Sequence, residues 1–346
     1  MTARRWLVCL LLLGMVSSTV SACQSPHPAA IGMNVHYRDD DAATVKRQFD
    51  LMAAMNVDWV RVDVDWSAIE PERGEFDWEP ADLLVDEALA HQMNVLIVLS
   101  YTPDWARSSA TDTKSPDSHF RPVDSMSYAR FARATAQRYA SRGVHHWEIW
   151  NEPNSTKFWP PRPDPDEYGA LFRVIRAAIR EVDPTAELLI GGLAPPYDPT
   201  DISATNYLEQ LYANGTAQLA DAVAVHPYSN PALPIMGEQS SGGLKDIPAL
   251  HAVMDRHGDT TKSIWITEFG AATGTAPDAV SEQDQAATLE WARLEAERWD
   301  WAGPLIYYEL VDGGTDVNDI EQNYGVLRAD LSPKQAAIDL TNGVSN

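Results

Sequence analysis

Residues 147–154 read Trp-Glu-Ile-Trp-Asn-Glu-Pro-Asn, an apolar run that passes into a polar ending without a helical period. Because proline cannot extend a sheet ladder and restricts the residue before it, we expect Glu152 to be extended at the last position of a strand. Residues 263–270 read Ser-Ile-Trp-Ile-Thr-Glu-Phe-Gly and have the same form, with Glu268 near the end. β-branched and aromatic residues favour strands, and the glycine marks a loop. The two stretches therefore place two glutamates at the ends of two strands.

The remaining sequence repeats this unit, with short apolar runs alternating with longer segments of helical period. The expected strands are 31–36, 58–66, 94–99, 145–151, 187–192, 221–226, 263–267 and 304–310, and the expected helices are 41–56, 81–91, 124–141, 164–181, 203–214, 244–257, 281–300 and 333–341. Such alternation predicts an α/β fold, and eight units close into a single (β/α)8 TIM barrel. We expect residues 31–346 to form it. An open doubly wound sheet is the alternative, disfavoured because no Gly-x-Gly-x-x-Gly turn follows the first strand.

The N-terminus has the features of an export signal. Arg4 and Arg5 precede an apolar stretch at 6–16, and small residues then lead to Val-Ser-Ala-Cys ending at Cys23. Residues 1–22 are therefore predicted to be a removable signal peptide, too short to span a membrane. The ending resembles the lipobox of bacterial lipoproteins, which implies that Cys23 carries a lipid and that residues 23–30 form a tether. The chain would then be exported and anchored to the outer face of a bacterial membrane. An ordinary signal peptide with a chance cysteine is the alternative.

The composition limits the kind of partner. The 346 residues include 26 basic and 50 acidic side chains, a net charge of −24, which repels nucleic acid and anionic lipid headgroups. A neutral substrate is therefore favoured, with membrane attachment through the N-terminal lipid only. Cys9 and Cys23 are the only cysteines, so an exported chain of this length must be held by its core and not by disulfides. We expect a monomer.

The predicted strand ends carry mainly polar and aromatic side chains, and in such barrels the active site forms there. They are His36, Asp65, Trp66, Tyr101, Asn151, Glu152, Gly192, His226, Tyr228, Glu268, Tyr308 and Glu309. Two carboxylates in this set suit acid, base or nucleophile roles. The sequence contains no His-x-His strand, no His-Glu-x-x-His helix and no cysteine cluster, so neither a metal nor another cofactor is expected.

The two glutamate stretches resemble those of clan A of the glycoside hydrolases, the retaining barrel enzymes. Arg61, the sequence Tyr-Thr-Pro-Asp-Trp-Ala at 101–106 and the His-Pro-Tyr at 226–228 extend the resemblance over nearly the whole mature chain. The stretches after the third and fourth strands are most similar to family 39, which includes β-xylosidases, iduronidases and bacterial exopolysaccharide hydrolases; family 5 is the neighbouring possibility. The chain departs from the pattern at the end of strand eight, where such enzymes often have Trp and this chain has Tyr307-Tyr308.

The resemblance implies a retaining glycoside hydrolase that cleaves O-glycosidic bonds of a polysaccharide or oligosaccharide. Glu152 would be the acid/base and Glu268 the nucleophile, two roles that need carboxyl groups about 5 Å apart in different surroundings. The other residues implied by the resemblance would hold Glu268 or bind the sugar. Arg61 and Tyr228 would hydrogen-bond Glu268, Asn151 would bind the sugar 2-hydroxyl, and His36, His226 and Tyr308 would line the site.

Other interpretations of these residues remain open. Arg61, Asp63 and Glu148 could form a structural polar network inside the barrel, because buried charges must be paired whatever their role. His226 could be a core histidine. A non-catalytic carbohydrate-binding barrel is a second function, although it would not need two carboxylates at these positions. A transglycosylase would use the same residues as a hydrolase.

The tryptophans are expected to divide between packing and sugar binding. Trp59, Trp147 and Trp265 lie within predicted strands and are expected to pack between sheet and helices. Trp66, Trp105, Trp150 and Trp159 lie near strand ends or in loops, where an aromatic face can stack on a sugar or pack in the core. Trp105 and Trp159 are the two predicted to bind substrate.

Overall fold

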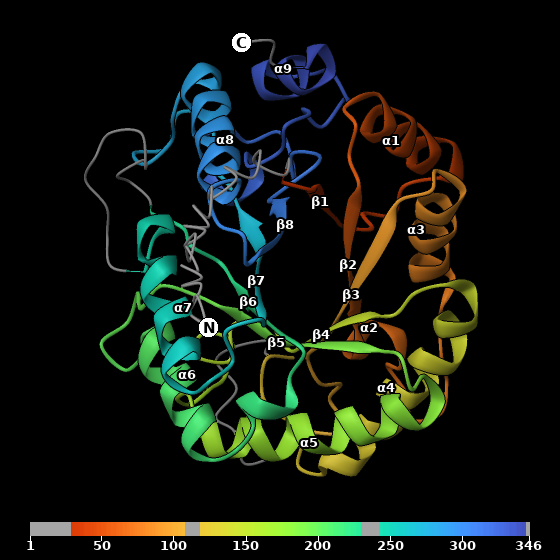
Figure 1. Cartoon of the computed structure of the whole chain (residues 1–346). Helices are drawn as coiled ribbons and strands as arrows, with labels where there is room; N and C mark the ends of the chain where they lie inside the picture. Colours follow the sequence, from red (N-terminus) through yellow and green to blue (C-terminus); the bar gives the residue numbers. More distant parts are fainter. Residues whose placement is uncertain (1–28, 108–117, 230–241, 344–346) are drawn as a thin grey trace, which may run out of the picture.

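The computed structural model describes residues 29–107, 118–229 and 242–343. Eight parallel strands form a closed barrel in the order β1 to β8, and the helices form a ring around it (Figure 1). The predicted TIM-barrel fold is therefore confirmed. The predicted signal peptide and Cys23 lie outside the described residues. Within those residues, no helix is both long enough and apolar enough to cross a lipid bilayer.

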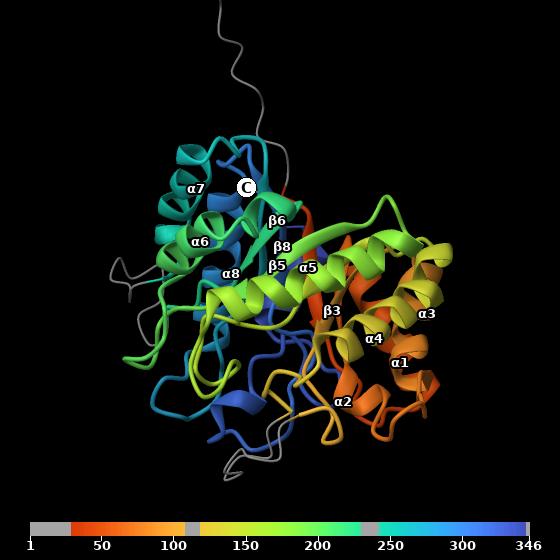
Figure 2. The same cartoon turned by 90° about the horizontal axis from the view of Figure 1, so that it is seen from below.

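All eight predicted strands and all eight predicted helices are present, with ends that shift by a few residues. The strands are β1 Ile31–Val35, β2 Trp59–Asp65, β3 Asn94–Ser100, β4 His146–Ile149, β5 Glu187–Leu193, β6 Ala222–Val225, β7 Ser263–Phe269 and β8 Ala302–Tyr307. The helices are α1 Ala42–Ala54, α2 Trp66–Ile69, α3 Glu79–Ala90, α4 Ser125–Tyr139, α5 Pro165–Val182, α6 Ala204–Ala213, α7 Ile247–Arg256, α8 Glu282–Ala296 and α9 Gln335–Asn342. The short helix α2 was not predicted. It follows β2 directly and marks, in Figure 2, the end of the barrel where the loops after the strands gather.

Short polar side chains fix where several helices begin. Asp41, Asp124, Asp164 and Ser281 each accept a hydrogen bond from a backbone N–H in the first turn of the helix that follows. Such caps satisfy N–H groups that have no partner inside the helix and each contributes on the order of 1 kcal/mol. The four capping residues fix the starts of the helices that follow β1, β3, β4 and β7. The loop between each strand end and its cap can therefore contribute to a site.

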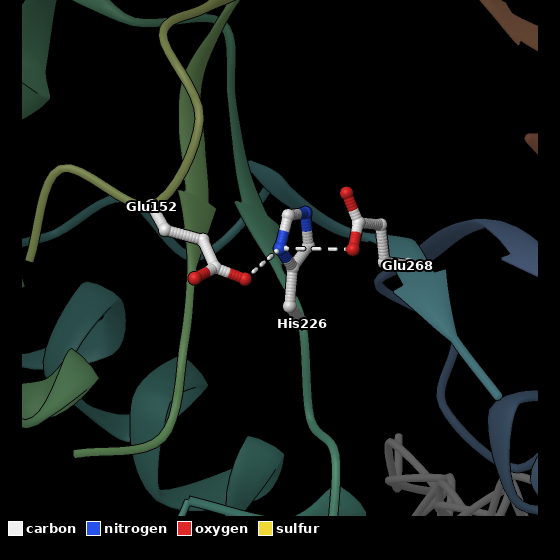
Figure 3. A group of neighbouring side chains, drawn as sticks. All are labelled: Glu152, His226 and Glu268. Carbon is white, nitrogen blue, oxygen red and sulfur yellow. Dashed lines mark hydrogen bonds and ion pairs between the residues drawn. The ribbon is translucent and has the colours of Figure 1, made fainter. Parts of the chain in front are cut away.

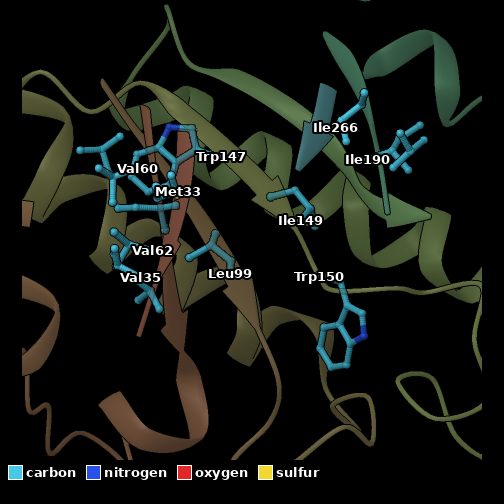
Figure 4. Packing of buried hydrophobic residues seen from close by; sticks show 14 of the residues in the cluster. Met33, Val35, Val60, Val62, Leu99, Trp147, Ile149, Trp150, Ile190 and Ile266 are labelled. Carbon is cyan, nitrogen blue, oxygen red and sulfur yellow. The ribbon is translucent and has the colours of Figure 1, made fainter. Parts of the chain in front are cut away.

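The main hydrophobic layer lies between the strands and the helices. Figure 4 shows part of it: Met33, Val60 and Trp147 lie close together, and Ile190 lies beside Ile266 in another part of the same cluster. Trp147 is fully buried in this layer. The prediction that it packs between sheet and helices is confirmed.

Trp59 and Trp265 lie elsewhere, so the prediction for them is wrong. Trp265 belongs to a separate cluster of inward-facing strand residues, against which Trp59 packs. Their rings meet edge to face with centroids 4.8 Å apart. Side chains alternate along a strand, and Trp59 has the same parity as the inward-facing Arg61. The two indoles therefore fill the interior of the barrel.

The chain around Glu152 also differs from the prediction. Strand β4 ends at Ile149, and Trp150 and Glu152 follow it with φ angles of 71° and 46°. Pro153 therefore does not hold Glu152 extended. The left-handed conformation disfavours residues with a Cβ by about 1–2 kcal/mol, so the surroundings must impose it. A hydrogen bond from the Trp150 N–H to the Leu99 carbonyl (2.8 Å) and one from the Ser155 N–H to the Glu152 carbonyl (3.0 Å) fix the turn.

Candidate active site

A cavity of about 890 Å³ opens at the end of the barrel where the strands finish. It contains both glutamates and, of the predicted binding residues, His36, Asn151, Tyr228 and Tyr308. Its full lining is His36, Asp63, Tyr101, Asn151, Glu152, Ser155, Thr156, Lys157, Phe158, Tyr197, Asp198, Asp201, Tyr228, Glu268, Asp278, Tyr308, Ile320, Glu321 and Tyr324. Seven of the twelve predicted strand-end residues thus line one cavity, whereas Asp65, Trp66, Gly192, His226 and Glu309 are not part of its lining.

Glu152 and Glu268 face each other across His226 (Figure 3). An oxygen of one carboxyl group lies within 4.8 Å of an oxygen of the other. The imidazole Nδ1 of His226 is 2.9 Å from Glu152 Oε1 and 3.6 Å from Glu268 Oε2. Carboxyl groups about 5–5.5 Å apart suit direct attack on a sugar, whereas about 6.5–9.5 Å leaves room for an intervening water. The spacing fits direct attack.

Each oxygen of Glu268 accepts a hydrogen bond from a residue of another strand or loop. The guanidinium Nη1 of Arg61 donates to Oε1 at 2.6 Å, and the Tyr228 hydroxyl donates to Oε2 at 3.0 Å. These two contacts are those that the family resemblance implies. Together they fix the carboxylate and stabilise its negative charge.

The surroundings of Glu152 favour the opposite protonation state. Burial raises the pKa of Glu152 above its usual value, and the hydrogen bond from His226 opposes this effect without cancelling it. Burial alone would lower the pKa of His226, but the charge of Glu268 and the bond to Glu152 raise it. These surroundings favour a proton on Glu152 and His226, whereas the hydrogen bonds from Arg61 and Tyr228 favour a negative charge on Glu268. Two carboxyl groups with different surroundings can act as acid and as nucleophile.

Arg61 connects the nucleophile position to the interior of the barrel. Its side chain is 1% exposed and donates to Glu148 from Nε (2.9 Å) and from Nη2 (3.2 Å). It also donates to the side-chain oxygens of Asn34 (2.8 Å) and Asn151 (3.1 Å). The same guanidinium therefore pairs with Glu148 inside the barrel and holds Glu268 in the site. Asp63 is not hydrogen-bonded to it and lies in the cavity wall.

His226 is fully buried and held from both sides. Its Nε2 lies 3.1 Å from the Thr267 hydroxyl, opposite the bond between Nδ1 and Glu152. Space for the ring comes from Gly192, where a Cβ would overlap the imidazole. The Gly-Gly at the end of β5 was a visible sequence signal, but its partner in space was not predictable from β5 alone.

His36 joins a second polar group on the opposite wall. Its Nδ1 is 3.2 Å from Asp63 Oδ2 and its Nε2 is 3.4 Å from Glu309 Oε2, while Arg38 pairs with the same Glu309 oxygen at 2.5 Å. Burial alone would lower the pKa of His36, but its bond to Asp63 raises it. The sequence places Glu309 at a strand end and Asp63 in a polar network inside the barrel, but it does not indicate that both contact His36.

Three tyrosine rings pack together in the cavity wall, and one of them, Tyr228, is hydrogen-bonded to Glu268. Tyr228, Tyr308 and Tyr324 meet edge to face, with centroids 5.5–6.4 Å apart. Tyr308 follows β8, so it occupies the place where the resemblance leads one to expect Trp. Tyr324 lies in a long loop without periodicity, and nothing in the sequence indicated it.

The tryptophans predicted to bind sugar do not line the cavity. Trp159 is 1% exposed and packs between Trp150 and Tyr168, with ring centroids 5.2 Å and 5.8 Å away. Trp105 is half-buried against Trp66, and its indole N–H donates to the Glu70 carbonyl at 2.9 Å. The predicted sugar-stacking role is therefore corrected for both, because Trp159 is buried by its neighbours and Trp105 packs against Trp66 outside the cavity lining.

The carboxyl pair and His226 also have the spacing of a metal site, since one ligand atom from each lies within 4.8 Å of the others. A hydrogen bond between His226 Nδ1 and Glu152 Oε1 already accounts for the short distance between these two residues. The arrangement of Glu152, His226 and Glu268 is therefore compatible with acid–base chemistry that involves no metal. The expectation that no metal takes part stays a prediction.

Comparison with known proteins gives one family-model match, described as "Cellulase (glycosyl hydrolase family 5)", over residues 21–303. An endo-1,4-beta-xylanase C from Paenibacillus barcinonensis is 26% identical over 198 residues, which cover 52% of this chain and 17% of the xylanase. The chain therefore spans about a sixth of this curated relative.

Solved structures with the same fold include a family 39 glycoside hydrolase from Bacteroides cellulosilyticus WH2 (TM-score 0.72, 24% identity, covering 91% of this chain and 63% of that one). A monomeric beta-xylosidase from Caulobacter crescentus CB15 gives a TM-score of 0.67 at 17% identity, covering 92% and 69%. A GH5_18 protein from Streptomyces cattleya, in complex with GlcNAc, gives 0.68 at 18%, covering 92% and 80%. Both families named from the sequence thus appear among the matches.

Replacing Gly192 by Ala tests the packing that holds His226. The added methyl group should displace the imidazole from Glu152, so the pKa of His226 should fall, and the overlap should destabilise the fold by about 1–3 kcal/mol. NMR titration of the imidazole and thermal unfolding measure the two effects. Gly313→Ala is the matched control, because its Cβ would meet no atom closer than 3.5 Å. A Gly192→Ala protein with unchanged imidazole titration would show that Gly192 does not position His226.

Proposed function

Because the chain belongs to glycosyl hydrolase family 5, we propose that it is a retaining glycoside hydrolase that cleaves O-glycosidic bonds of an oligosaccharide or polysaccharide. The observation that carries the proposal is the facing pair of carboxyl groups within 4.8 Å, one hydrogen-bonded to the buried His226 and one held by Arg61 and Tyr228. A non-catalytic carbohydrate-binding barrel would not require a donor on both oxygens of a buried carboxylate.

In the first step Glu268 attacks the anomeric carbon. The bond from that carbon to the leaving oxygen breaks, Glu152 transfers its proton to the oxygen, and an ester forms between the sugar and Glu268. Arg61 and Tyr228 keep the attacking carboxylate in place. Asn151 lines the cavity while its Oδ1 accepts from Arg61, which leaves its amide group to donate to the sugar 2-hydroxyl.

In the second step water attacks the anomeric carbon from the side the leaving group vacated. Glu152, now a carboxylate, accepts a proton from the water, and the bond between the sugar and Glu268 breaks. Both groups return to their starting states, and two inversions give a product of retained configuration. His226 keeps Glu152 aimed at the same point in both steps.

The charge of the cavity supports a neutral sugar. Besides the catalytic pair, its walls carry Asp63, Asp198, Asp201, Asp278 and Glu321. Lys157 and His36 are the basic side chains in the same described lining. A uronate or sulfated sugar would be repelled, whereas hydroxyl groups can donate to these carboxylates. β-Linked xylosides are the first substrates to test, because a xylanase and a xylosidase are among the similar proteins.

We also propose that the protein works as a monomer outside a bacterial membrane, held there by a lipid on Cys23. The apolar stretch at 6–16 and the Val-Ser-Ala-Cys ending support this location. The net charge of −24 supports attachment through lipid and a partner other than nucleic acid.

Truncation of each glutamate assigns its role. Glu268→Ala removes the nucleophile, so no glycosyl-enzyme forms and turnover should vanish on every substrate, with azide producing an inverted glycosyl azide. Glu152→Ala should still react with an activated aryl glycoside and then stall, because the second step lacks its base. Azide should then release a product of retained configuration. Steady-state rates and NMR of the azide products measure this.

On an unactivated substrate, loss of Glu152 should lower the rate by about 10² to 10⁴, and loss of Glu268 by more. The conservative variants Glu152→Gln and Glu268→Gln preserve size and control for packing. If azide inverted the product of Glu152→Ala and retained that of Glu268→Ala, the two roles would be exchanged. Near-normal turnover in both variants would remove the pair from the mechanism.

Prolonged dialysis against EDTA should leave turnover unchanged, because Glu152 and Glu268 suffice for both steps. Metal analysis before and after dialysis shows whether an ion was removed. Loss of activity that one added metal alone restores would identify Glu152, His226 and Glu268 as a metal site instead.

Mass spectrometry of protein extracted from native membranes tests the anchor. The mature N-terminus should be Cys23 with a covalently attached lipid, and Cys23→Ser should release the protein from the membrane fraction. An unmodified N-terminus at another residue would overturn the lipoprotein assignment and leave the proposed enzyme activity untouched.

A further inference from the structure

We propose that Tyr197 and Phe158 form the binding site for the sugar on the leaving-group side of the scissile bond. The proposal rests on the proposed function and deepens it, because it identifies a substrate whose leaving group is itself a neutral sugar. Both rings line the cavity that contains Glu152 and Glu268. Neither residue was singled out by the sequence.

The position of Glu152 determines which wall faces the leaving group. Strands β4 and β5 lie across the closed barrel from β8 and β1. His36 and Tyr308 line the cavity on the β8–β1 side, and Phe158 and Tyr197 line it on the β4–β5 side. An acid must lie within about 2.6–3.2 Å of the oxygen it protonates, so the leaving sugar must lie next to Glu152 and against the β4–β5 wall.

Both aromatic side chains of this wall line the cavity, but they differ in exposure. Tyr197 is 62% exposed, although most aromatic side chains of the described chain are buried. Phe158 is half-buried and packs against His119, with centroids 4.7 Å apart, and against Tyr101, with centroids 6.4 Å apart. Lys157 Nζ lies 4.9 Å from the Phe158 centroid. Tyr197 is therefore the exposed ring of this wall, and a sugar ring supplies the C–H face that can cover it. Phe158 extends the same wall beside it.

The wall is rigid before any ligand binds because Asp201 joins the two loops. Its Oδ1 accepts from the Thr156 N–H (2.7 Å), and its Oδ2 accepts from the N–H groups of Tyr197 (3.0 Å) and Asp198 (2.9 Å). The Thr156 and Thr200 hydroxyls are hydrogen-bonded at 2.6 Å. The loops after β4 and β5 therefore form one surface.

A second set of hydrogen bonds, made by the side chain of Asn154, also joins the loops after β4 and β5. The buried Asn154 amide donates to the carbonyls of Ala194 and Ile202, both at 2.8 Å, and its oxygen accepts from the Ala194 N–H at 3.0 Å. A platform held this firmly loses little conformational entropy on binding. Asp201 and Asn154 act as positioning residues for Tyr197.

The hydroxyl of Tyr197 stays protonated and can donate to a sugar. A tyrosine hydroxyl has an ordinary pKa of about 10, so it is protonated at neutral pH without any help from its surroundings. The ring, however, supplies most of the apolar contact. Removal of the ring should therefore matter more than removal of the hydroxyl.

The test compares two substrates with the same reacting sugar, chosen as the one with the highest turnover in an aryl glycoside panel. For xylose the pair is β-xylosyl fluoride, which has no leaving sugar, and xylobiose. The ratio of kcat/KM for xylobiose to kcat/KM for the fluoride measures how much contacts with the leaving sugar contribute to catalysis. For Tyr197→Ala and for Phe158→Ala this ratio should fall about 10- to 100-fold, as expected for loss of an aromatic contact.

Tyr197→Phe should keep most of the ratio, and Asp201→Ala should lower it by freeing the loop. Phe76→Ala is the matched control, because Phe76 is 40% exposed and lies outside the cavity lining. Thermal unfolding confirms that each variant is folded. An unchanged ratio in both Tyr197→Ala and Phe158→Ala overturns the proposal while the hydrolase function stands. A wild-type protein that hydrolyses no glycosyl fluoride or aryl glycoside refutes the proposed function itself.

Discussion

The buried guanidinium of Arg61 is the interaction on which both the barrel and its site depend. It lies on β2 and binds Asn34 on β1, Glu148 on β4 and Glu268 on β7. A charge this deeply buried must be paired, and breaking a buried ion pair by removing one partner destabilises a protein by about 3–5 kcal/mol. Glu148 satisfies the charge inside the barrel and leaves Nη1 to hold the nucleophile. Stability and site geometry therefore cannot be separated here.

The two carboxyl groups differ because the chain supports them differently. Glu268 lies on a strand and is held by charge and by the Tyr228 hydroxyl. Glu152 lies three residues beyond β4 in a left-handed conformation, and its carboxyl group is held by a buried histidine. Burial without a nearby guanidinium raises the pKa of Glu152. The same barrel end thus supplies an acid and an anion within one cavity, which is what a double displacement requires.

The sequence contained most of the fold and the centre of the site. Strand periodicity identified all eight strands, and the two glutamate stretches identified the reacting pair as candidates. Alternation along β2 could also have placed Trp59 inside the barrel beside Arg61, but the tryptophan was assigned by its apolar character alone. Loops were the least predictable part, because their positions depend on contacts far away in the sequence. The backbone N–H of Tyr197 is held by Asp201, and Trp159 packs between Trp150 and Tyr168. Local periodicity reveals none of these contacts.

The central claim is that Glu268 forms a covalent bond to the sugar. A 2-deoxy-2-fluoroglycosyl fluoride tests it directly, since the fluorine at C2 slows breakdown of the glycosyl-enzyme and the fluoride leaves without protonation. After peptic digestion, mass spectrometry should find one fluorosugar on the peptide that contains Glu268, with activity lost in step with labelling. A label on Glu152, or complete turnover of the reagent by an unlabelled protein with inverted product, would contradict the account.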